Sequence, residues 1–170
     1  MTPQDALTIS IPSLLTGVIG YGSAALVYRQ KEWRALRLSA AEAVIPRLET
    51  LRHLVRISDR RADTAEWHAS TAAALDAIDA ELHRLPRRWH HLKQSVRIAI
   101  GEASGVLAFA DRIPYDPDTH MAPYSPTWAG NAEDYLTYCL GRLRVWRDEL
   151  PPRRRVPDLV PFDDWLRSRE

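Results

Sequence analysis

Two patterns of residue spacing in this 170-residue chain could support chemistry, and the first is a set of possible metal ligands. Asp116, Asp118 and His120 alternate with a proline and a threonine, so two carboxylates and one imidazole lie close together in the sequence. Oxygen and nitrogen donors of this kind can gather around a divalent cation. In proline-rich loops, however, Asp side chains more often bond to the backbone of their own turn. We therefore expect no metal and no other cofactor, and Asp116, Asp118 and His120 are the residues that would form a metal site.

The second pattern is an arginine followed six positions later by a histidine. It occurs at Arg47 with His53 and again at Arg84 with His90. This Arg-x5-His spacing is similar to the motif of small all-helical ribonucleases of the HEPN type, and the resemblance is confined to these few residues. It implies that the arginine would hold the scissile phosphate and that the histidine would assist proton transfer. A HEPN-like ribonuclease is therefore one alternative function for this chain.

No other enzyme motif is found in the sequence. The seven glycines do not have the spacing of a phosphate-binding loop, a dinucleotide fingerprint or a nucleophile elbow. No glutamate is followed three residues later by histidine, which excludes the di-iron motif of helical bundles. The single cysteine, Cys139, excludes an internal disulfide and falls on an apolar helical stripe, where we expect it to be buried. These observations favour a protein that acts through contacts and not through catalysis.

The N-terminal segment has the composition of a membrane span. No charged side chain occurs in the 23 residues Ala6–Tyr28, and their most apolar part is the 18 residues Ile11–Tyr28. At about 1.5 Å per residue, a helix of that length covers about 27 Å, close to the roughly 30 Å of the hydrocarbon core of a bilayer. The alternatives are a buried helix of a soluble bundle and a cleaved signal peptide. A signal peptide carries its positive charge before the apolar stretch, whereas here the charge follows it.

Basic residues flank the C-terminal end of this predicted span. Arg29, Lys31, Arg34 and Arg37 follow it, whereas one acidic side chain and no basic one precede it. Because Lys and Arg are retained on the cytoplasmic side, we expect the N-terminus outside the cell membrane and residues 29–170 in the cytoplasm. Anionic lipid headgroups are the simplest partner for these cations. The net charge of +1 gives no argument for a nucleic-acid partner, and none is expected.

Small side chains recur along the span at every fourth position. Thr16, Gly20 and Ala24 would therefore stack on one face of the helix. Small residues on one face let two helix backbones approach closely inside a membrane. The pattern predicts a homo-oligomer formed through the span, or contact with the span of another protein.

The segment after the span has the apolar periodicity of helices separated by prolines. Its segments alternate in net charge, +5 over 29–61, −4 over 62–86, +3 over 87–110 and −3 over 111–150, which favours antiparallel neighbours. We predict a kink or a new helix start near Ile45 and Pro46, a helix that begins at Pro86, and a last helix capped by Asn131. The predicted core stripes are Ile45, Leu48, Leu51 and Val55; Trp67, Thr71, Ala74, Leu75, Ile78, Leu82 and Leu85; Trp89, Leu92, Val96, Ala99, Ala103, Val106 and Ala110; and Leu136, Cys139, Leu140, Leu143, Trp146 and Leu150.

Together these patterns predict an all-α protein in three parts. Residues 1–28 form a single transmembrane helix, residues 29–150 an antiparallel bundle of about four helices, and residues 151–170 a tail rich in proline and arginine. The tail is expected to be extended with a short final helix, and its aromatic residues to dock on the bundle or on another protein, or to stay free. The predicted function is tethering, assembly or sensing at the cytoplasmic membrane face through an unknown protein partner. A soluble helical-bundle interaction protein is the second alternative, beside the ribonuclease.

Overall fold

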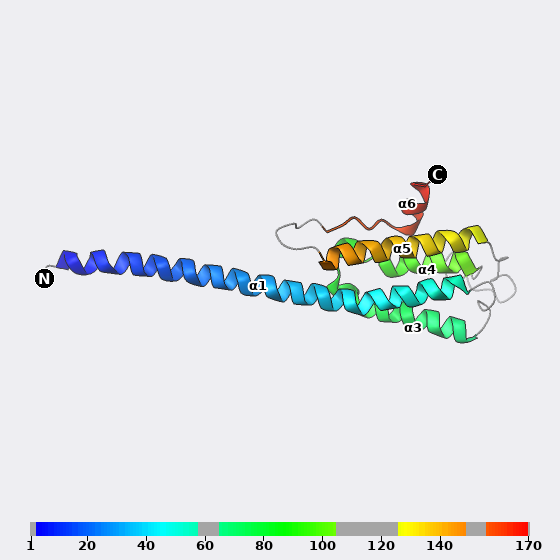
Figure 1. Ribbon diagram of the computed structural model, residues 1–170, viewed down its shortest axis with the longest axis horizontal. Helices are drawn as coiled ribbons and strands as arrows, with labels where there is room; N and C mark the ends of the chain where they lie inside the picture. Colours follow the sequence, from blue (N-terminus) through cyan, green and yellow to red (C-terminus); the bar gives the residue numbers. More distant parts are fainter. Residues whose placement is uncertain (1–2, 58–64, 105–125, 149–155, 170) are drawn as a thin grey trace. The chain divides into compact units, whose positions relative to one another are not determined.

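The structure is a computed structural model that describes the backbone of residues 3–57, 65–104, 126–148 and 156–169, and the side chains of these ranges from Tyr28 onward except Gln30. All regular elements in these ranges are helical, which confirms the predicted all-α bundle (Figure 1). The chain divides into two compact units, residues 1–36 and 37–170. The helices are α1 (Pro3–Arg56), α3 (Ala65–Glu81), α4 (Leu92–Ser104), α5 (Pro126–Asp148) and α6 (Phe162–Arg167), with the 3-10 turns η1 (Leu82–Arg84) and η2 (Arg87–Trp89) between α3 and α4.

The first unit contains the N-terminal part of α1, and the predicted span Ile11–Tyr28 lies within this helix. Apart from Tyr28, the side chains of the predicted span lie outside the described residues. Where side chains are described, the helices include no stretch that is both long enough and apolar enough to cross a bilayer.

In the second unit, the C-terminal part of α1 and the following helix α3 form an antiparallel pair. At one end of the pair, the indole N–H of Trp67 donates to the carbonyl oxygen of Leu54 at 3.0 Å. At the other end, Arg84, in the turn that follows α3, donates to Ser39 Oγ at 2.6 Å. These two contacts join residues that are 13 and 45 positions apart, as expected when one helix returns along another.

Ion pairs connect α4 to α3 and α5 to α1, and α4 packs directly on α5. Lys93 of α4 lies 3.1 Å from a carboxylate oxygen of Asp79 in α3. In α5, Glu133 accepts hydrogen bonds from Arg56 near the end of α1, with the Arg56 Nε at 2.7 Å. The order of neighbours is therefore α1, α3, α4, α5 and again α1, with chain direction alternating around the ring. Exposed pairs of this kind contribute a few tenths of a kcal/mol each, so they select the arrangement more than they stabilise it.

The core of this bundle is filled by the predicted apolar stripes together with aromatic side chains. The rings of Trp89 and Trp146 meet edge to face with centroids 5.3 Å apart, which joins η2, just before α4, to the end of α5. Cys139 is fully buried, as the stripe predicted. The largest fully buried side chains are Trp67, Trp89, Tyr135 and Phe162, followed by Leu48, Leu51, Ile78, Leu92, Ile100, Leu136, Leu140 and Leu143. Of the predicted stripes, Val106, Ala110 and Leu150 lie outside the described residues.

Of the two alternatives predicted near Ile45 and Pro46, a kink or a new helix start, the new start is wrong, because α1 continues through Pro46 to Arg56. A proline inside a helix removes one backbone hydrogen bond and crowds the preceding turn, at a cost of about 3 kcal/mol. Buried residues on both sides of Pro46, among them Val44 and Leu48, pack into one core and hold the helix in register. Thr50 Oγ1 also donates to the Pro46 carbonyl oxygen at 3.0 Å. Packing therefore outweighs the local preference.

Two other predicted helix starts are also wrong. The helix expected from Pro86 begins at Leu92, because the 3-10 turn Arg87–Trp89 comes first. That turn allows both Leu85 and Trp89, which flank Pro86 and the change of chain direction, to be buried. The last helix begins at Pro126 and not after Asn131. Proline suits the first position of a helix, where its missing N–H has no intrahelical partner to lose.

Replacing Pro46 by alanine tests whether packing alone carries α1 through this position. Pro46 is exposed, so Pro46→Ala should restore the missing backbone hydrogen bond at little packing cost and raise the free energy of unfolding by about 1–2 kcal/mol. Urea unfolding followed by circular dichroism measures the change. Arg47→Ala, at the next exposed position, is the control and should change stability by less than about 0.5 kcal/mol. A loss of stability in Pro46→Ala would show that the proline itself supports the fold.

Candidate functional site

The structure places the predicted chemistry-bearing residues in different settings. Asp116, Asp118 and His120 lie outside the described residues. Elsewhere, among the residues with described side chains, no three His, Cys, Asp or Glu residues lie close enough together to hold a metal ion.

The first Arg-x5-His pair, Arg47 and His53, lies on the exposed surface of α1. Residues six apart in a helix point about 120° away from one another, because each residue turns the helix by about 100°. The two side chains therefore lie on different sides of α1. A shared substrate phosphate needs both groups on one side.

The second pair, Arg84 and His90, is separated by two short turns. The guanidinium of Arg84 is 2.6 Å from Glu81 Oε2 and 2.6 Å from Ser39 Oγ, and is only partly exposed. These contacts tie η1 to α3 and to α1. Arg84 is thus engaged in holding helices together, whereas His90 is exposed.

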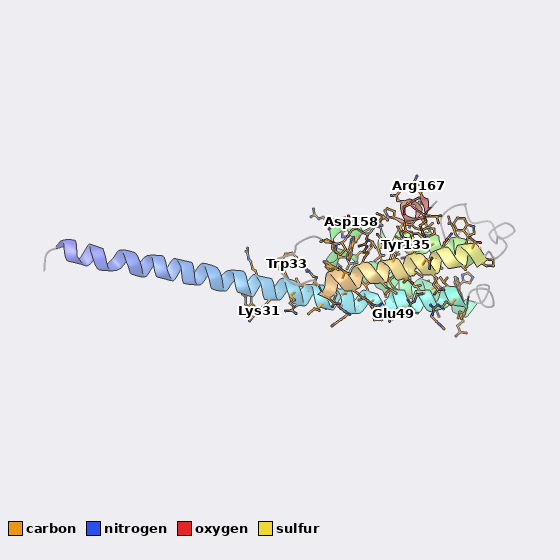
Figure 2. The ribbon with its side chains drawn as sticks, turned by 45° about the horizontal axis from the view of Figure 1, so that its top comes forward. Lys31, Trp33, Glu49, Tyr135, Asp158 and Arg167 are labelled. Carbon is orange, nitrogen blue, oxygen red and sulfur yellow. The ribbon has the colours of Figure 1, made fainter. Side chains whose placement is uncertain are left out.

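Tyr28, the last residue of the predicted span, and most of the residues that follow it are exposed on α1. Tyr28 is 64% exposed, Trp33 69% and Leu36 51%, which is unusual for large apolar side chains. Arg29 and Lys31 are also exposed, as is Arg34, and Figure 2 shows Lys31 and Trp33 as sticks on α1.

The last flanking cation, Arg37, is half-buried, unlike the three exposed cations before it. Its guanidinium lies over the Trp146 ring at 5.8 Å from the centroid. That contact belongs to the second unit. Thr16, Gly20 and Ala24 lie in α1, and their side chains are outside the described residues.

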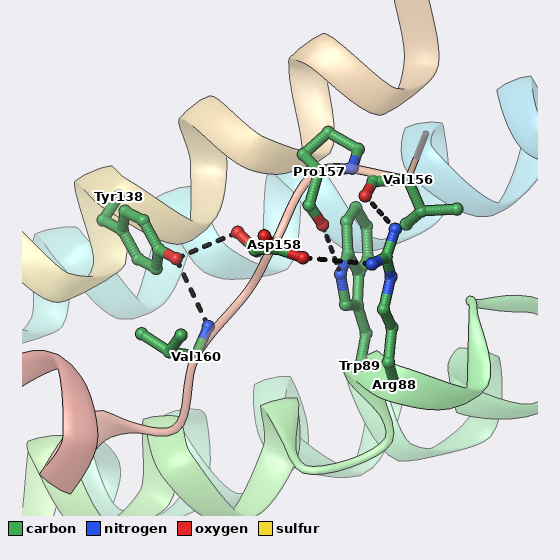
Figure 3. A network of polar contacts seen from close by, with 7 residues as sticks. All are labelled: Arg88, Trp89, Tyr138, Val156, Pro157, Asp158 and Val160. Atoms are coloured by element: carbon green, nitrogen blue, oxygen red, sulfur yellow. Dashed lines mark hydrogen bonds and ion pairs between the residues drawn. The ribbon is translucent and has the colours of Figure 1, made fainter. Parts of the chain in front are cut away.

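The most extensive polar network involves the C-terminal segment Val156–Arg169, here called the docked tail, which packs on the bundle beside η2, α4 and α5 (Figure 3). Bundle side chains donate to four of its backbone carbonyl oxygens. The Trp89 indole N–H donates to Pro157 at 3.1 Å, and the Tyr138 hydroxyl donates to Asp158 at 3.0 Å. Arg88 donates to Val156, and Tyr135 donates to Val160 at 3.0 Å. Of the three alternatives for the tail, docking on its own bundle is the one that the structure shows for residues 156–169.

Apolar side chains anchor the same segment. Leu159, Phe162 and Trp165 are at most 9% exposed and belong to the hydrophobic core. The Tyr135 ring contacts both Phe162, with centroids 5.1 Å apart, and Trp165, with centroids 5.4 Å apart. Edge-to-face contacts of this kind add about 0.5–1.5 kcal/mol each to the burial of apolar area. The bundle surface that receives the tail, formed by Arg88, Trp89, Tyr135 and Tyr138, is called the tail groove below.

Burial changes the acid–base properties of two groups near the tail groove. Burial lowers the pKa of His91, partly offset by hydrogen bonds to the Val160 and Arg88 backbone and by the Asp164 charge. The His91 Nε2 is buried without a hydrogen-bond partner, which is consistent with a neutral ring. Burial raises the pKa of the Cys139 thiol to about 12. It also raises the pKa of the Tyr135 phenol, which therefore stays protonated and remains a hydrogen-bond donor.

Sequence reasoning did not find the tail groove. Arg88 and Tyr138 were not singled out, because a side chain that binds a distant backbone carbonyl leaves no spacing signal. The sequence contains only part of a signal that could have indicated this contact. Tyr135 and Tyr138 are three residues apart on one helix, and tail residues Pro157 and Pro161 favour an extended backbone.

Comparisons with protein-family models, with curated proteins and with solved structures found no match to this chain. The proposals below therefore rest on the sequence and on the contacts described above.

The buried state of Cys139 predicts an unreactive thiol. At pH 8.5 an ordinary thiol is about half ionised, whereas a pKa of about 12 leaves the Cys139 thiolate rare. Iodoacetamide should therefore modify the folded protein at least about 100-fold more slowly than the protein in 6 M guanidinium, as measured by mass spectrometry. Because Cys139 is the only cysteine, the readout is unambiguous. Equal rates in the two states would contradict the buried position.

The same raised pKa predicts that stability falls in alkaline solution. The unfolded thiol loses its proton above about pH 8.5, whereas the folded thiol keeps it until about pH 12, so ionisation favours unfolding as the pH rises through this window. From pH 8.5 to 10 the loss is about 2 kcal/mol. Denaturant titrations at both pH values should show this slope, and Cys139→Ala should lose most of it, since the raised pKa of Tyr135 contributes only about 0.4 kcal/mol up to pH 10. An identical slope in Cys139→Ala would assign the effect to other groups.

Proposed function

We propose that this chain is a single-pass membrane-anchored protein, with its N-terminus outside the cell membrane and its helical bundle at the cytoplasmic face. The observation that carries the proposal is the uncharged segment Ala6–Tyr28 followed directly by a cationic flank. The helical conformation of α1 from Pro3 onward supports it, because a helix satisfies every internal backbone hydrogen bond inside a bilayer.

The exposed residues at the end of the span and just after it support the same orientation. Tyr28 and Trp33 have the amphipathic rings that settle at the interface between lipid and water. Arg29, Lys31 and Arg34 are exposed beside them and suit anionic headgroups, at about 1 kcal/mol for each cation near the surface. Membrane lipid is therefore the proposed first partner, and it accounts for large aromatic side chains that would otherwise face water.

The span also offers a surface for self-association. Thr16, Gly20 and Ala24 place small residues on one face of α1, and their spacing supports a homo-oligomer through the membrane. Association of this type depends on close backbone contact, which a larger side chain at Gly20 would prevent.

The proposed role of the bundle is non-catalytic: it tethers, assembles or senses through protein contacts. Its described polar surface includes several ion pairs that connect helices, such as Glu49 with Arg144 at 2.6 Å. Its most elaborate set of directed hydrogen-bond donors, in the tail groove, binds polypeptide backbone. Donors arranged in this way serve recognition of a chain segment.

A charge in the middle of the span tests the anchor. Val18→Arg places a cation where it costs about 2.5–3.5 kcal/mol of insertion free energy. The unmodified chain should stay in the membrane pellet after a carbonate wash, whereas a substantial fraction of Val18→Arg should be released. Ala35→Arg introduces the same residue on the exposed flank and should stay in the pellet. Release of the unmodified chain into the supernatant would overturn the proposal.

Orientation is tested separately with membrane vesicles of known sidedness. Protease added to inside-out vesicles should digest the bundle, whereas in right-side-out vesicles residues 29–170 should be protected until detergent is added. The reverse result would place the bundle outside and contradict the orientation while leaving the anchor intact.

A further inference from the structure

We infer that the tail groove is a recognition site for an extended, proline-containing segment of a partner protein, and that the docked tail is its intramolecular ligand. The inference rests on the proposed function, since it names the surface through which the bundle would hold a protein at the membrane. The occupant is defined by the chemistry of the segment already seated there: proline in an extended backbone, an acidic residue, and aromatic anchors that follow.

The groove binds the backbone of its ligand more than its side chains. Arg88, Trp89, Tyr138 and Tyr135 contact four carbonyl oxygens within the range Val156–Val160. The Tyr138 hydroxyl also accepts the backbone N–H of Val160 at 3.2 Å, so one hydroxyl binds both a carbonyl and an amide. Figure 3 shows Tyr138 on one side of the extended segment and Arg88 and Trp89 on the other. Backbone contacts of this kind tolerate many side-chain sequences.

The conformation of the ligand fits this type of recognition. Residues 156–161 have no regular secondary structure, and Pro161 has φ −56° and ψ 155°, within the polyproline II region. Such segments lose little conformational freedom on binding, because they are already extended before they bind. Aromatic-lined grooves are the usual receptors for them. The Trp89 indole lines the groove in this way, and its N–H donates to the carbonyl oxygen of Pro157 itself.

Two further features set the chemistry of the ligand. Arg88 lies 3.0 Å from Asp158, so a cation of the groove matches an acidic residue beside the first proline. The Asp158 side chain is 84% exposed, and this pair lies at the rim. Phe162 and Trp165 then fill the apolar part of the groove against Tyr135. A partner segment should therefore carry proline and an acidic residue followed by two aromatic residues within one helical turn.

The tail is small enough to leave without unfolding the bundle. It has three deeply buried anchors, Leu159, Phe162 and Trp165, and its helix α6 has six residues. Short helices of this kind draw their stability from docking and not from their own hydrogen bonds. Local opening of a terminal element costs less than global unfolding, so a partner segment competes with the tail and not with the fold.

Competition in the full-length protein, purified in detergent, tests the inference. The double variant Phe162→Ala/Trp165→Ala should release the tail, and a fluorescent peptide of residues 156–169 should then bind to the vacated groove, as measured by anisotropy. A tethered tail has an effective concentration on the order of 1 mM, so for a peptide Kd of about 10 µM the unmodified chain should bind the peptide about 100-fold more weakly. Absence of binding to a double variant that keeps its helical circular dichroism would overturn the inference.

A matched pair of substitutions locates the binding. Added to the double variant, Tyr138→Phe removes the hydroxyl that contacts Asp158 and Val160 and should weaken peptide binding about tenfold. Tyr28→Phe is the same substitution outside the groove and should leave binding unchanged. A peptide of scrambled sequence should not bind. Equal effects of the two substitutions would show that the peptide binds elsewhere.

Hydrogen exchange of the unmodified chain decides the matter even where the double variant fails to fold. Backbone amides of the tail, including Val160 and Trp165, should exchange faster than the core amides of α4 and α5. Exchange of tail and core amides at one common rate would show that the tail leaves only on global unfolding, and would overturn the inference.

A concentration-dependent dimer that the peptide dissociates would assign the groove to a second copy of this chain and overturn the assignment to another protein. Peptide binding in detergent is independent of the carbonate wash, so either proposal can fail alone.

Discussion

The fully buried indole of Trp89 is the constraint on which the rest of the second unit depends. An indole N–H removed from water needs an acceptor, and leaving it unpaired would cost about 1–3 kcal/mol. Neither the turn that carries Trp89 nor its contact with Trp146 supplies one, and the Pro157 carbonyl oxygen does, at 3.1 Å. The same residue therefore fixes the junction of α4 and α5 through its ring and the position of the C-terminal segment through its nitrogen.

A similar rule governs the other large buried side chains. Trp67 of α3 donates to the Leu54 carbonyl of α1, and Tyr135 donates to Val160 in the tail. Each aromatic residue fills a large volume of the core, and its one polar atom then selects a single neighbour. The apolar part of these side chains drives collapse of the bundle, whereas the polar atom determines which backbone segment lies beside it.

The helices and their core faces could be predicted from local pattern, and the exceptions have physical reasons. Leu48, Ile78, Val96 and Leu143 are buried where the three-and-four spacing placed them, because burial of a helix face needs only periodicity. Pro46 was misread because its cost of about 3 kcal/mol is local, whereas the burial that offsets it comes from helices far along the chain. The start of α5 was placed too late because Asn131 is a good cap and Pro126 is an equally good first residue, so propensity alone could not choose between them.

The amino-acid sequence by itself determined that this chain is helical, which faces of its helices are apolar, and where charge is absent and then concentrated near the N-terminus. These properties follow from the order of side chains along a regular helix, without reference to distant contacts. Only the tertiary structure decided that the C-terminal segment packs on its own bundle, that Arg84 joins three elements, and that Tyr138 and Arg88 bind backbone atoms. Backbone carbonyls are the same at every residue, so which side chain will bind which carbonyl has no trace in the sequence and emerges only when the chain is folded.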